Sequence, residues 1–258
     1  MMRDNFLNPK DVTLVREILP KKYVRYELLD GQYGYIRISH FDKETDAAFG
    51  QAAEDLNRNS HNNLKGLILD LRYNPGGLLD QAVRVADRLI ESGLIASVEG
   101  NNEYKRMMFR AQRERTLPPY PLVVMANKAT GAGSEIVVGA LQDHQRAIII
   151  GDQTLGEATI QTIFPLRKGY VLRLTTAVWR TPNGHQIEKK GIVPELYIIS
   201  EKEASSSSLR SDQAKIMIDR SEKDTALRIA LEILKRTKSR EFADLMAASR
   251  EVCDIEQR

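Results

Sequence analysis

The feature that most constrains the fold is a repeated order of short apolar strand, glycine-rich turn and helix. Residues 67–71 form an apolar run bounded by Gly66, and Asn74-Pro-Gly-Gly77 follows it. Residues 78–91 carry apolar side chains at helical spacing, with Gly93 as a stop signal. Further elements of this series are expected as strands over 95–98, 122–126 and 147–150 and as a helix over 134–141. Strands that alternate with helices are typical of parallel βαβ units, so the sequence predicts an α/β fold.

Other segments add a hairpin and a C-terminal helix to this pattern. We expect strands over 12–18 and 33–39, a helix over 46–57 capped by Thr45, a surface excursion over 101–121, a hairpin of 159–166 with 170–178, a flexible serine-rich linker around 205–208, and a helix over 224–236. In this last helix, Leu227, Ala230, Leu231 and Leu234 share one face. Such a face seldom stays in water, so it is predicted to dock on the core or on a second copy of the chain, which would make a homo-oligomer.

Composition excludes several classes of protein. The chain has 258 residues, a formal net charge of +3, 42% hydrophobic residues and 28% charged residues, as in ordinary globular proteins. Basic residues alternate with acidic ones and no aromatic pattern accompanies them, which argues against a nucleic-acid partner. No apolar run approaches the roughly 18 residues of a membrane span. Cys253 is the single cysteine and the four histidines lack ligand spacing, so neither a disulfide nor a metal or other cofactor is expected.

Four ordered segments carry a resemblance to a known family. They are 66–77, 126–143, 151–162 and 190–194. In this order they closely resemble the C-terminal processing peptidases, also called tail-specific proteases, which are serine peptidases with a Ser/Lys dyad. The resemblance runs from about residue 12 to 199 and implies a crotonase/Clp-protease-like α/β core of βαβ units, with a β-hairpin region and C-terminal helices.

The same resemblance divides the chain and implies a location. Residues 1–32 resemble the last strand of a PDZ domain (Asp11–Leu19) with its linker, 33–200 resemble the peptidase core, and 201–258 form the serine-rich linker and C-terminal helical segment. Members of the family work outside the cytoplasm, in the periplasm or envelope, behind a secretion signal. Residues 1–10 are mostly polar and show no such signal, so a complete chain would be expected in the cytoplasm.

Glycines at two turns are the candidates for binding a carbonyl oxygen. Asn74-Pro-Gly-Gly77 ends a strand and opens a helix, where glycines leave backbone N–H groups unshielded at the positive end of the helix dipole. Without the resemblance, an ordinary strand-to-helix turn is the favoured interpretation of this stretch, and the resemblance reverses that preference. The resemblance assigns Gly76, Gly77 and Gly133 to the oxyanion hole and to peptide binding.

Both reactive positions of the dyad are replaced. Aligned on Thr130 and on 134–136, the serine nucleophile of the family falls on Ala132, and the lysine base falls on Glu157. Gln161 matches the glutamine that assists the dyad. Alanine cannot attack a carbonyl, and the lysine of such a dyad acts as a neutral amine. Since loss of a serine nucleophile costs on the order of a million-fold in turnover, the resemblance predicts a core without catalysis.

Other polar residues do not supply an obvious substitute. Ser134 lies two residues beyond the nucleophile position at a helix start, which points it to the opposite side. We interpret it as an N-cap or first-turn residue, with Glu135 favourable at the positive end of the helix dipole. The remaining candidates are Thr130, interpreted as a turn residue, and His144 and His185, interpreted as solvated surface residues.

Three functional hypotheses follow. The chain is an active or engineered endopeptidase that cuts near protein C-termini, a non-catalytic peptide-binding or assembly protein, or a crotonase-type acyl enzyme with Glu157 as base, although nothing signals coenzyme A. Ala132 and Glu157 favour the second. A serine-to-alanine change is commonly made in the laboratory to trap a peptidase with its substrate, whereas a lysine-to-glutamate change is not. The two replacements together therefore favour a natural loss of catalysis. The expected partner is an extended polypeptide or a protein C-terminus.

Overall fold

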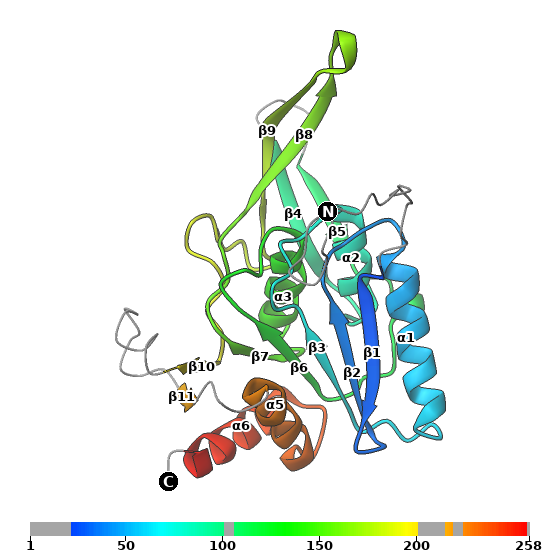
Figure 1. Ribbon diagram of the computed structural model, residues 1–258, viewed down its shortest axis with the longest axis vertical. Coiled ribbons are helices and arrows are strands. Elements are labelled where there is room, and N and C mark those ends of the chain that lie inside the picture. The colour runs from blue at the N-terminus through cyan, green and yellow to red at the C-terminus, as the bar shows by residue number, and fades with distance from the viewer. Residues whose placement is uncertain (1–21, 101–105, 201–214, 219–223, 257–258) are drawn as a thin grey trace, which may run out of the picture.

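The computed structural model describes residues 22–100, 106–200, 215–218 and 224–256 (Figure 1). The strands are β1 Val24–Leu29, β2 Tyr33–Ile38, β3 Gly66–Asp70, β4 Leu94–Gly100, β5 Met107–Arg110, β6 Leu122–Ala126, β7 Ile148–Gly151, β8 Thr159–Pro165, β9 Val171–Arg180, β10 Leu196–Ser200 and β11 Lys215–Ile218. The helices are α1 Thr45–Asn59, α2 Leu79–Asp87, α3 Gly133–Asp143, α5 Thr225–Arg236 and α6 Phe242–Glu256. The strand expected over 12–18 and the serine run lie outside the described residues.

The main sheet is built from the predicted parallel units. It has seven strands in the order β1-β2-β3-β6-β7-β10-β11. The pair β1 and β2 is antiparallel, and every other neighbouring pair is parallel. The apolar runs of β3, β6 and β7 are buried along their whole length, as expected for strands covered on both faces. The predicted α/β fold is confirmed.

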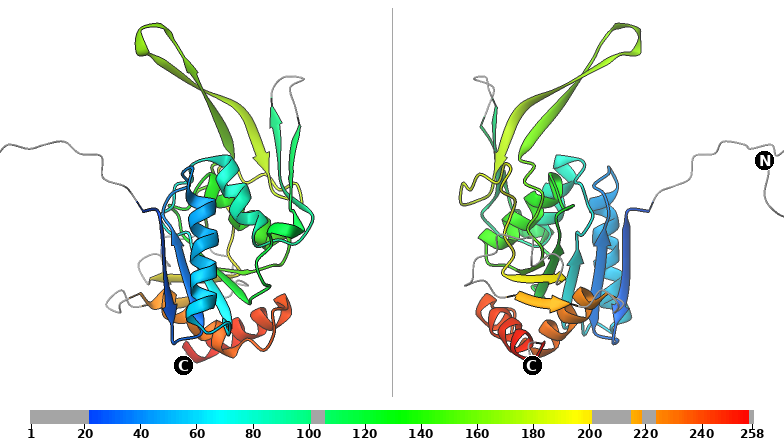
Figure 2. Two further views of the ribbon diagram at one scale, coloured as in Figure 1. Left: turned by 90° about the vertical axis from the view of Figure 1, so that its right-hand side faces the viewer. Right: turned by 60° about the vertical axis from the view of Figure 1, so that its left-hand side comes forward.

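Successive side chains of the central strands point to opposite faces of the main sheet, and each face belongs to a separate hydrophobic core. Leu67 and Leu69 of β3 belong to the core that the main sheet shares with α1, α2 and α3, whereas Ile68 belongs to the core under α5 and α6. The two groups of helices are set apart in both views of Figure 2. The main sheet is therefore the middle layer of three.

The C-terminal helix docks on this second core. Ala230 and Leu234 of α5 are buried, and Leu227 and Leu231 pack partly against the same cluster. The prediction of a docked apolar face is confirmed, with the sheet of the same chain as its partner. Helix α6, which lies in the predicted C-terminal helical segment but was given no bounds from the sequence, completes the layer. Among the helices of the described residues, none is long and apolar enough to cross a membrane.

A second sheet corrects one expectation. It has four strands in the order β5-β4-β9-β8, all antiparallel. Strand β4 was expected among the parallel units, but it pairs antiparallel with β5 and β9. An apolar run this short does not indicate whether its neighbouring strands are parallel or antiparallel. Strand β5 lies inside the predicted surface excursion. The predicted hairpin is confirmed, and β8 and β9 project well beyond the body of the molecule (Figure 1).

Two helix ends also differ from expectation. Helix α2 ends at Asp87 rather than near residue 91. Thr45 is the first residue of α1 and not its cap. The Thr45 hydroxyl accepts a hydrogen bond from the Asp42 backbone N–H and donates one to the Asp42 carboxylate, both at 2.8 Å. A threonine before an apolar periodic run predicts a helix start without fixing the residue at which it begins.

Candidate functional site

The first glycine turn is held in place by Asn74, which lies in the loop after β3. Asn74 is fully buried; its Nδ2 donates to the Ile38 carbonyl at 2.9 Å, and its Oδ1 accepts from the Gly76 N–H at 2.9 Å. Gly76 and Gly77 have φ of 101° and 140°, in the region that side chains disfavour. Asn74 therefore holds the turn in a conformation that needs glycine.

The second turn, residues 131–134, is tied to the first by one carbonyl. The Asn74 carbonyl oxygen accepts hydrogen bonds from the Gly131 N–H and from the Ser134 hydroxyl, both at 3.0 Å. A methyl group built on Gly76 would lie 2.8 Å from Cβ of Ala132, so a side chain there would drive the turns apart. Two segments separated by more than fifty residues thus form one structural unit.

Ala132 occupies the sharp corner between β6 and α3. Its backbone has φ 46° and ψ −114°, which an alanine adopts only under constraint. Such a conformation costs on the order of 1–3 kcal/mol and persists where its surroundings fix it. The Asn74 contacts on one side and Glu135 on the other supply that constraint. A strained corner is thus held in place around a residue whose side chain is a methyl group.

Glu135 is the central brace of the site. Its buried carboxylate accepts four hydrogen bonds, from the Thr154 hydroxyl and from the N–H groups of Gly156, Glu157 and Ala132. Burial raises the pKa of Glu135, against the opposite effect of these hydrogen bonds. The sequence analysis assigned it only to the helix dipole. Its position three residues after the helix N-cap is the capping-box spacing, a signal that could have identified half of this role.

The motif of residues 151–162 is held in place by the motif of residues 190–194 and the residues just before it. Thr154 Oγ1 accepts from the Ile192 N–H at 2.7 Å, and the Lys189 N–H donates to the Gly156 carbonyl at 2.8 Å. Gly191, at φ 63°, leaves no room for a side chain, because a methyl group would lie 2.1 Å from the Thr154 carbonyl oxygen. The segment 187–192 therefore holds residues 154–157 in position.

The Glu157 side chain lies beside the corner at Ala132. Its Oε2 is 3.8 Å from where a methyl group on Gly131 would sit. No described residue hydrogen-bonds or ion-pairs with this carboxylate, and the side chain is half-buried. The two positions that the family resemblance assigns to the dyad, Ala132 and Glu157, are thus close together, and the second carries a carboxyl group.

Two backbone donors next to Ala132 are unengaged. Within the described residues, the N–H groups of Gly77 and Gly133 donate to no acceptor, whereas the Gly76 N–H is used by Asn74. A methyl group on Gly133 would lie 3.6 Å from the Gly77 nitrogen, so the two donors are neighbours. Of the three predicted glycines, two can offer an N–H to a carbonyl oxygen and Gly76 cannot.

The other predicted residues are engaged elsewhere. Gln161 lies on β8, and its Nε2 donates to the Thr175 hydroxyl across the hairpin at 2.7 Å rather than to the corner at Ala132. Ser134 is fully buried on the Asn74 carbonyl, in the first turn of α3. Thr130 is buried too, and its hydroxyl donates to the Leu71 carbonyl at 2.9 Å. Both hydroxyls are therefore inaccessible to solvent and engaged with backbone carbonyls.

The two histidines differ from each other. His144 was expected to be solvated, but its Nε2 lies 2.7 Å from the Leu94 carbonyl and its ring packs on Gly93. Since Gly93 has no side chain, the ring fits against the backbone, which is why the prediction was wrong. His185 is exposed as expected and lies 3.4 Å from the Asp143 carboxylate. In the described ranges no three His, Cys, Asp or Glu side chains group in a way that could hold a metal ion.

Comparisons with known proteins agree with this architecture. The profile of peptidase family S41 matches residues 32–198. Over 191 residues the chain is 41% identical to a carboxy-terminal-processing protease of Bartonella bacilliformis, covering 74% of this chain and 44% of that protein. It is 36% identical over 187 residues to the carboxy-terminal processing protease CtpA of Bacillus subtilis, covering 72% and 39%. The chain therefore spans less than half the length of these relatives.

A solved structure gives the same picture. The photosystem II D1 C-terminal processing protease superposes with a TM-score of 0.61 at 29% sequence identity, over 70% of this chain and 50% of that one. The four motifs described above fall within the matched part of the chain.

Proposed function

The chain belongs to peptidase family S41, and from this we propose that it is a non-catalytic member that holds an extended polypeptide without cutting it. The observation that supports this most is the corner at Ala132. The side chain at this corner is only a methyl group, yet the backbone is strained, Glu135 holds it in place, and two N–H groups beside it are unengaged within the described residues. The apparatus for holding a carbonyl is retained where the means of attacking it is gone.

Two features argue against a replacement nucleophile. Ser134 uses its hydroxyl hydrogen on the Asn74 carbonyl and is inaccessible, so it cannot reach a substrate carbonyl. Glu157 is an acid where the lysine base of the family is expected. The N–H groups of Gly77 and Gly133 would then bind the carbonyl oxygen of an uncleaved peptide rather than stabilise a transition state.

Strand β8 offers a place for the rest of the polypeptide. It is the edge strand of the second sheet and begins two residues after Glu157. An edge strand exposes unpaired N–H and C=O groups that an extended peptide can pair with. We infer that the bound polypeptide adds to β8 as a further strand, with one carbonyl at the glycine donors.

The hairpin can also contact side chains of the bound polypeptide. Register places Phe164, Leu172 and Leu174 on one face, and Leu166 with Tyr170 continues it. These five side chains are between 42% and 69% exposed, which is unusual for a contiguous apolar set. A partner with alternating apolar side chains would cover them.

The charge of Glu157 should select the partner. A carboxylate beside the carbonyl site repels a free C-terminal carboxylate and favours a lysine or arginine side chain. We therefore infer an internal or amidated basic segment as the preferred ligand over a protein C-terminus. By resemblance to the family we also infer a location outside the cytoplasm, which fractionation of the source cells would test.

Titration of fluorescent peptides tests the proposal. An extended apolar peptide amide with one lysine should bind with a dissociation constant in roughly the micromolar to millimolar range, and the same peptide with glutamate and a free carboxylate more weakly. Glu157→Gln should reduce this difference, and Phe164→Ser with Leu172→Ser should weaken both peptides. The control peptide is N-methylated at alternate residues and cannot pair with β8. Equal binding of the methylated peptide, or no binding by folded protein, would overturn the proposal.

A further inference from the structure

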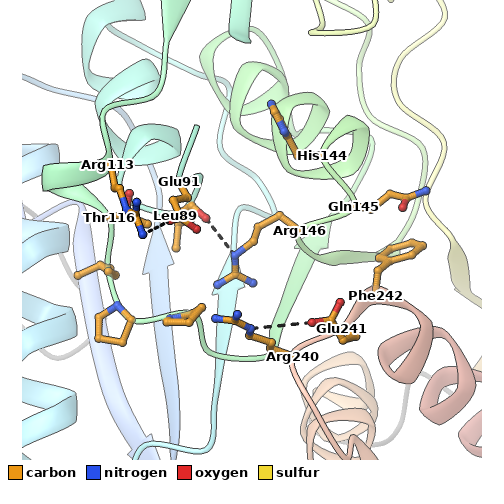
Figure 3. A pocket seen from close by; sticks show the side chains of 13 residues that line it. Leu89, Glu91, Arg113, Thr116, His144, Gln145, Arg146, Arg240, Glu241 and Phe242 are labelled. Atoms are coloured by element: carbon orange, nitrogen blue, oxygen red, sulfur yellow. Dashed lines mark hydrogen bonds and ion pairs between the residues drawn. The ribbon is translucent and has the colours of Figure 1, made fainter. Parts of the chain in front are cut away.

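A separate cavity lies at the other end of α3. It has a volume of about 740 Å³ and is enclosed by the segment after α2, residues 113–119, the segment after α3 and the turn between α5 and α6 (Figure 3). With a rise of about 1.5 Å per residue, the length of α3 separates the cavity from Ala132 by roughly 16 Å. The peptide site and its motifs do not contribute to it.

Arg146 is the distinctive group in this cavity. Its Nε donates to the Leu89 carbonyl at 3.0 Å, while the two Nη atoms contact no acceptor among the described residues. Among the described residues, no fully buried side-chain nitrogen lacks a hydrogen-bond partner. Because the two Nη atoms have no partner, they are not fully buried, and the Arg146 side chain lines the cavity. No described carboxylate lies within ion-pair distance of this guanidinium. A half-buried arginine without a counter-charge is uncommon, since buried charges are normally paired.

A second arginine, Arg240, adds to the excess of positive charge in the cavity. The guanidinium groups of Arg146 and Arg240 point toward each other across the cavity in Figure 3. Burial, together with the charge of Arg240, lowers the pKa of Arg146 to about 10, which still leaves it charged at neutral pH. Within the described part of the chain, the one ion-pair partner of Arg240 is Glu241, at 4.0 Å. The two cations are therefore close and incompletely neutralised.

The acids of the cavity are engaged with other cations. Glu91 pairs with Arg113 at 3.0 Å, and both side chains are mainly exposed at the rim. Glu241 is the weak partner of Arg240. A bound anion would supply the counter-charge that Arg146 lacks.

We propose that this cavity binds a phosphate monoester, with the phosphate between Arg146 and Arg240. Guanidinium groups offer forked N–H donors that match phosphate oxygens, and donors from two sides suit a tetrahedral dianion better than a planar carboxylate. The cavity is larger than a phosphate ion and within the size range of small-molecule sites. Leu117, Pro118, Pro119 and Phe242 line the remainder, so an apolar or aromatic ester group has a surface to pack on.

Calorimetric titration of the full chain with phenyl phosphate and with inorganic phosphate, at constant ionic strength, tests the proposal. We expect phenyl phosphate to bind more tightly than phosphate, and Arg146→Met and Arg240→Met each to weaken it about 10-fold or more, the loss of a charge-assisted hydrogen bond. Arg58→Met, on an exposed arginine of α1, is the matched control and should bind like wild type.

The exposed position of Arg240 keeps the test decisive. If Arg146→Met does not fold, Arg240→Met still decides, because its side chain is 58% exposed and its loss leaves packing intact. Wild-type affinity in Arg240→Met, equal weakening in Arg58→Met, or no heat of binding from wild type at millimolar phenyl phosphate would each overturn the proposal. Binding by all three variants alike would indicate only general attraction to a basic protein.

Discussion

The backbone N–H groups of Ala132 and Glu157 donate to the same oxygen atom, Oε2 of Glu135, at 3.0 Å and 2.8 Å. These two residues stand where the family resemblance places the serine and lysine of the dyad. One carboxylate therefore positions both backbones, although neither side chain can perform the chemistry. The brace depends on backbone atoms, so it is insensitive to the side chains at the two positions.

Removing this brace should destabilise the protein. Glu135→Ala leaves four donors without an acceptor in a buried place, and we expect the free energy of unfolding to fall by roughly 3 kcal/mol or more. Urea denaturation of wild type and variant measures this change in the free energy of unfolding. Glu188→Ala is the control, because within the described residues its carboxylate accepts a single hydrogen bond, from the Ala158 N–H. A loss below about 1 kcal/mol for Glu135→Ala would contradict the assigned role.

Acid sensitivity should depend on Asp46. Burial alone would raise the pKa of Asp46, but hydrogen bonds from Arg88 and Arg115 outweigh it and hold the pKa below its ordinary value. The contribution of Asp46 to stability is therefore present above its unfolded pKa of about 3.9 and is lost as pH falls through the lower folded value.

The measurement for Asp46 is a pair of pH series. We expect Asp46→Asn to be less stable than wild type by about 1–3 kcal/mol at pH 7 and the gap to close below about pH 4. Glu54→Gln, on the exposed side of α1, should show no such gap. A gap that stays constant down to pH 2 would show that packing, rather than ionisation, causes the loss.

Arg72 should be needed to dock α5. Its guanidinium binds the fully buried Asp70 at 2.7 Å and Asp224, the N-cap of α5, at 2.8 Å. Arg72→Met leaves the Asp70 charge poorly compensated, which typically costs about 3–5 kcal/mol. Asp224→Asn should cost only about 1 kcal/mol, because Asp224 is more exposed and asparagine still caps a helix. Thermal unfolding compares the two, and equal losses would contradict this ranking.

The C-terminal helices should be required for solubility. Ile68, Val123, Met125, Ile148 and Ile150 lie beneath α5 and α6, so a chain ending at Ser200 exposes this apolar face of the sheet. We expect the truncated chain to sediment as large aggregates or to lose cooperative unfolding. A monomer with the stability of the full chain would show that the helices add nothing to the core.

The sequence predicted the parts of the structure whose signals are local. The strand, turn and helix of 66–87, the hairpin after Glu157 and the face of α5 all follow from periodicity and turn residues. It could not predict the antiparallel partners of β4, because a short buried run fits either kind of sheet. Nor could it predict the three partners of Glu135 that lie about twenty residues further on, or the absence of a counter-charge for Arg146 in the described residues. Those depend on packing between distant segments.

Labelling with a serine-directed fluorophosphonate tests most directly the central claim that the framework is kept and the reactive groups are lost. Wild type should not be labelled, whereas Ala132→Ser with Glu157→Lys should be, and adding Ser134→Ala to that double variant should leave the labelling unchanged. Mass spectrometry of the labelled peptide would locate the adduct at position 132. Labelling of wild type that disappears in Ser134→Ala would contradict the account, as would a folded double variant that remains unlabelled.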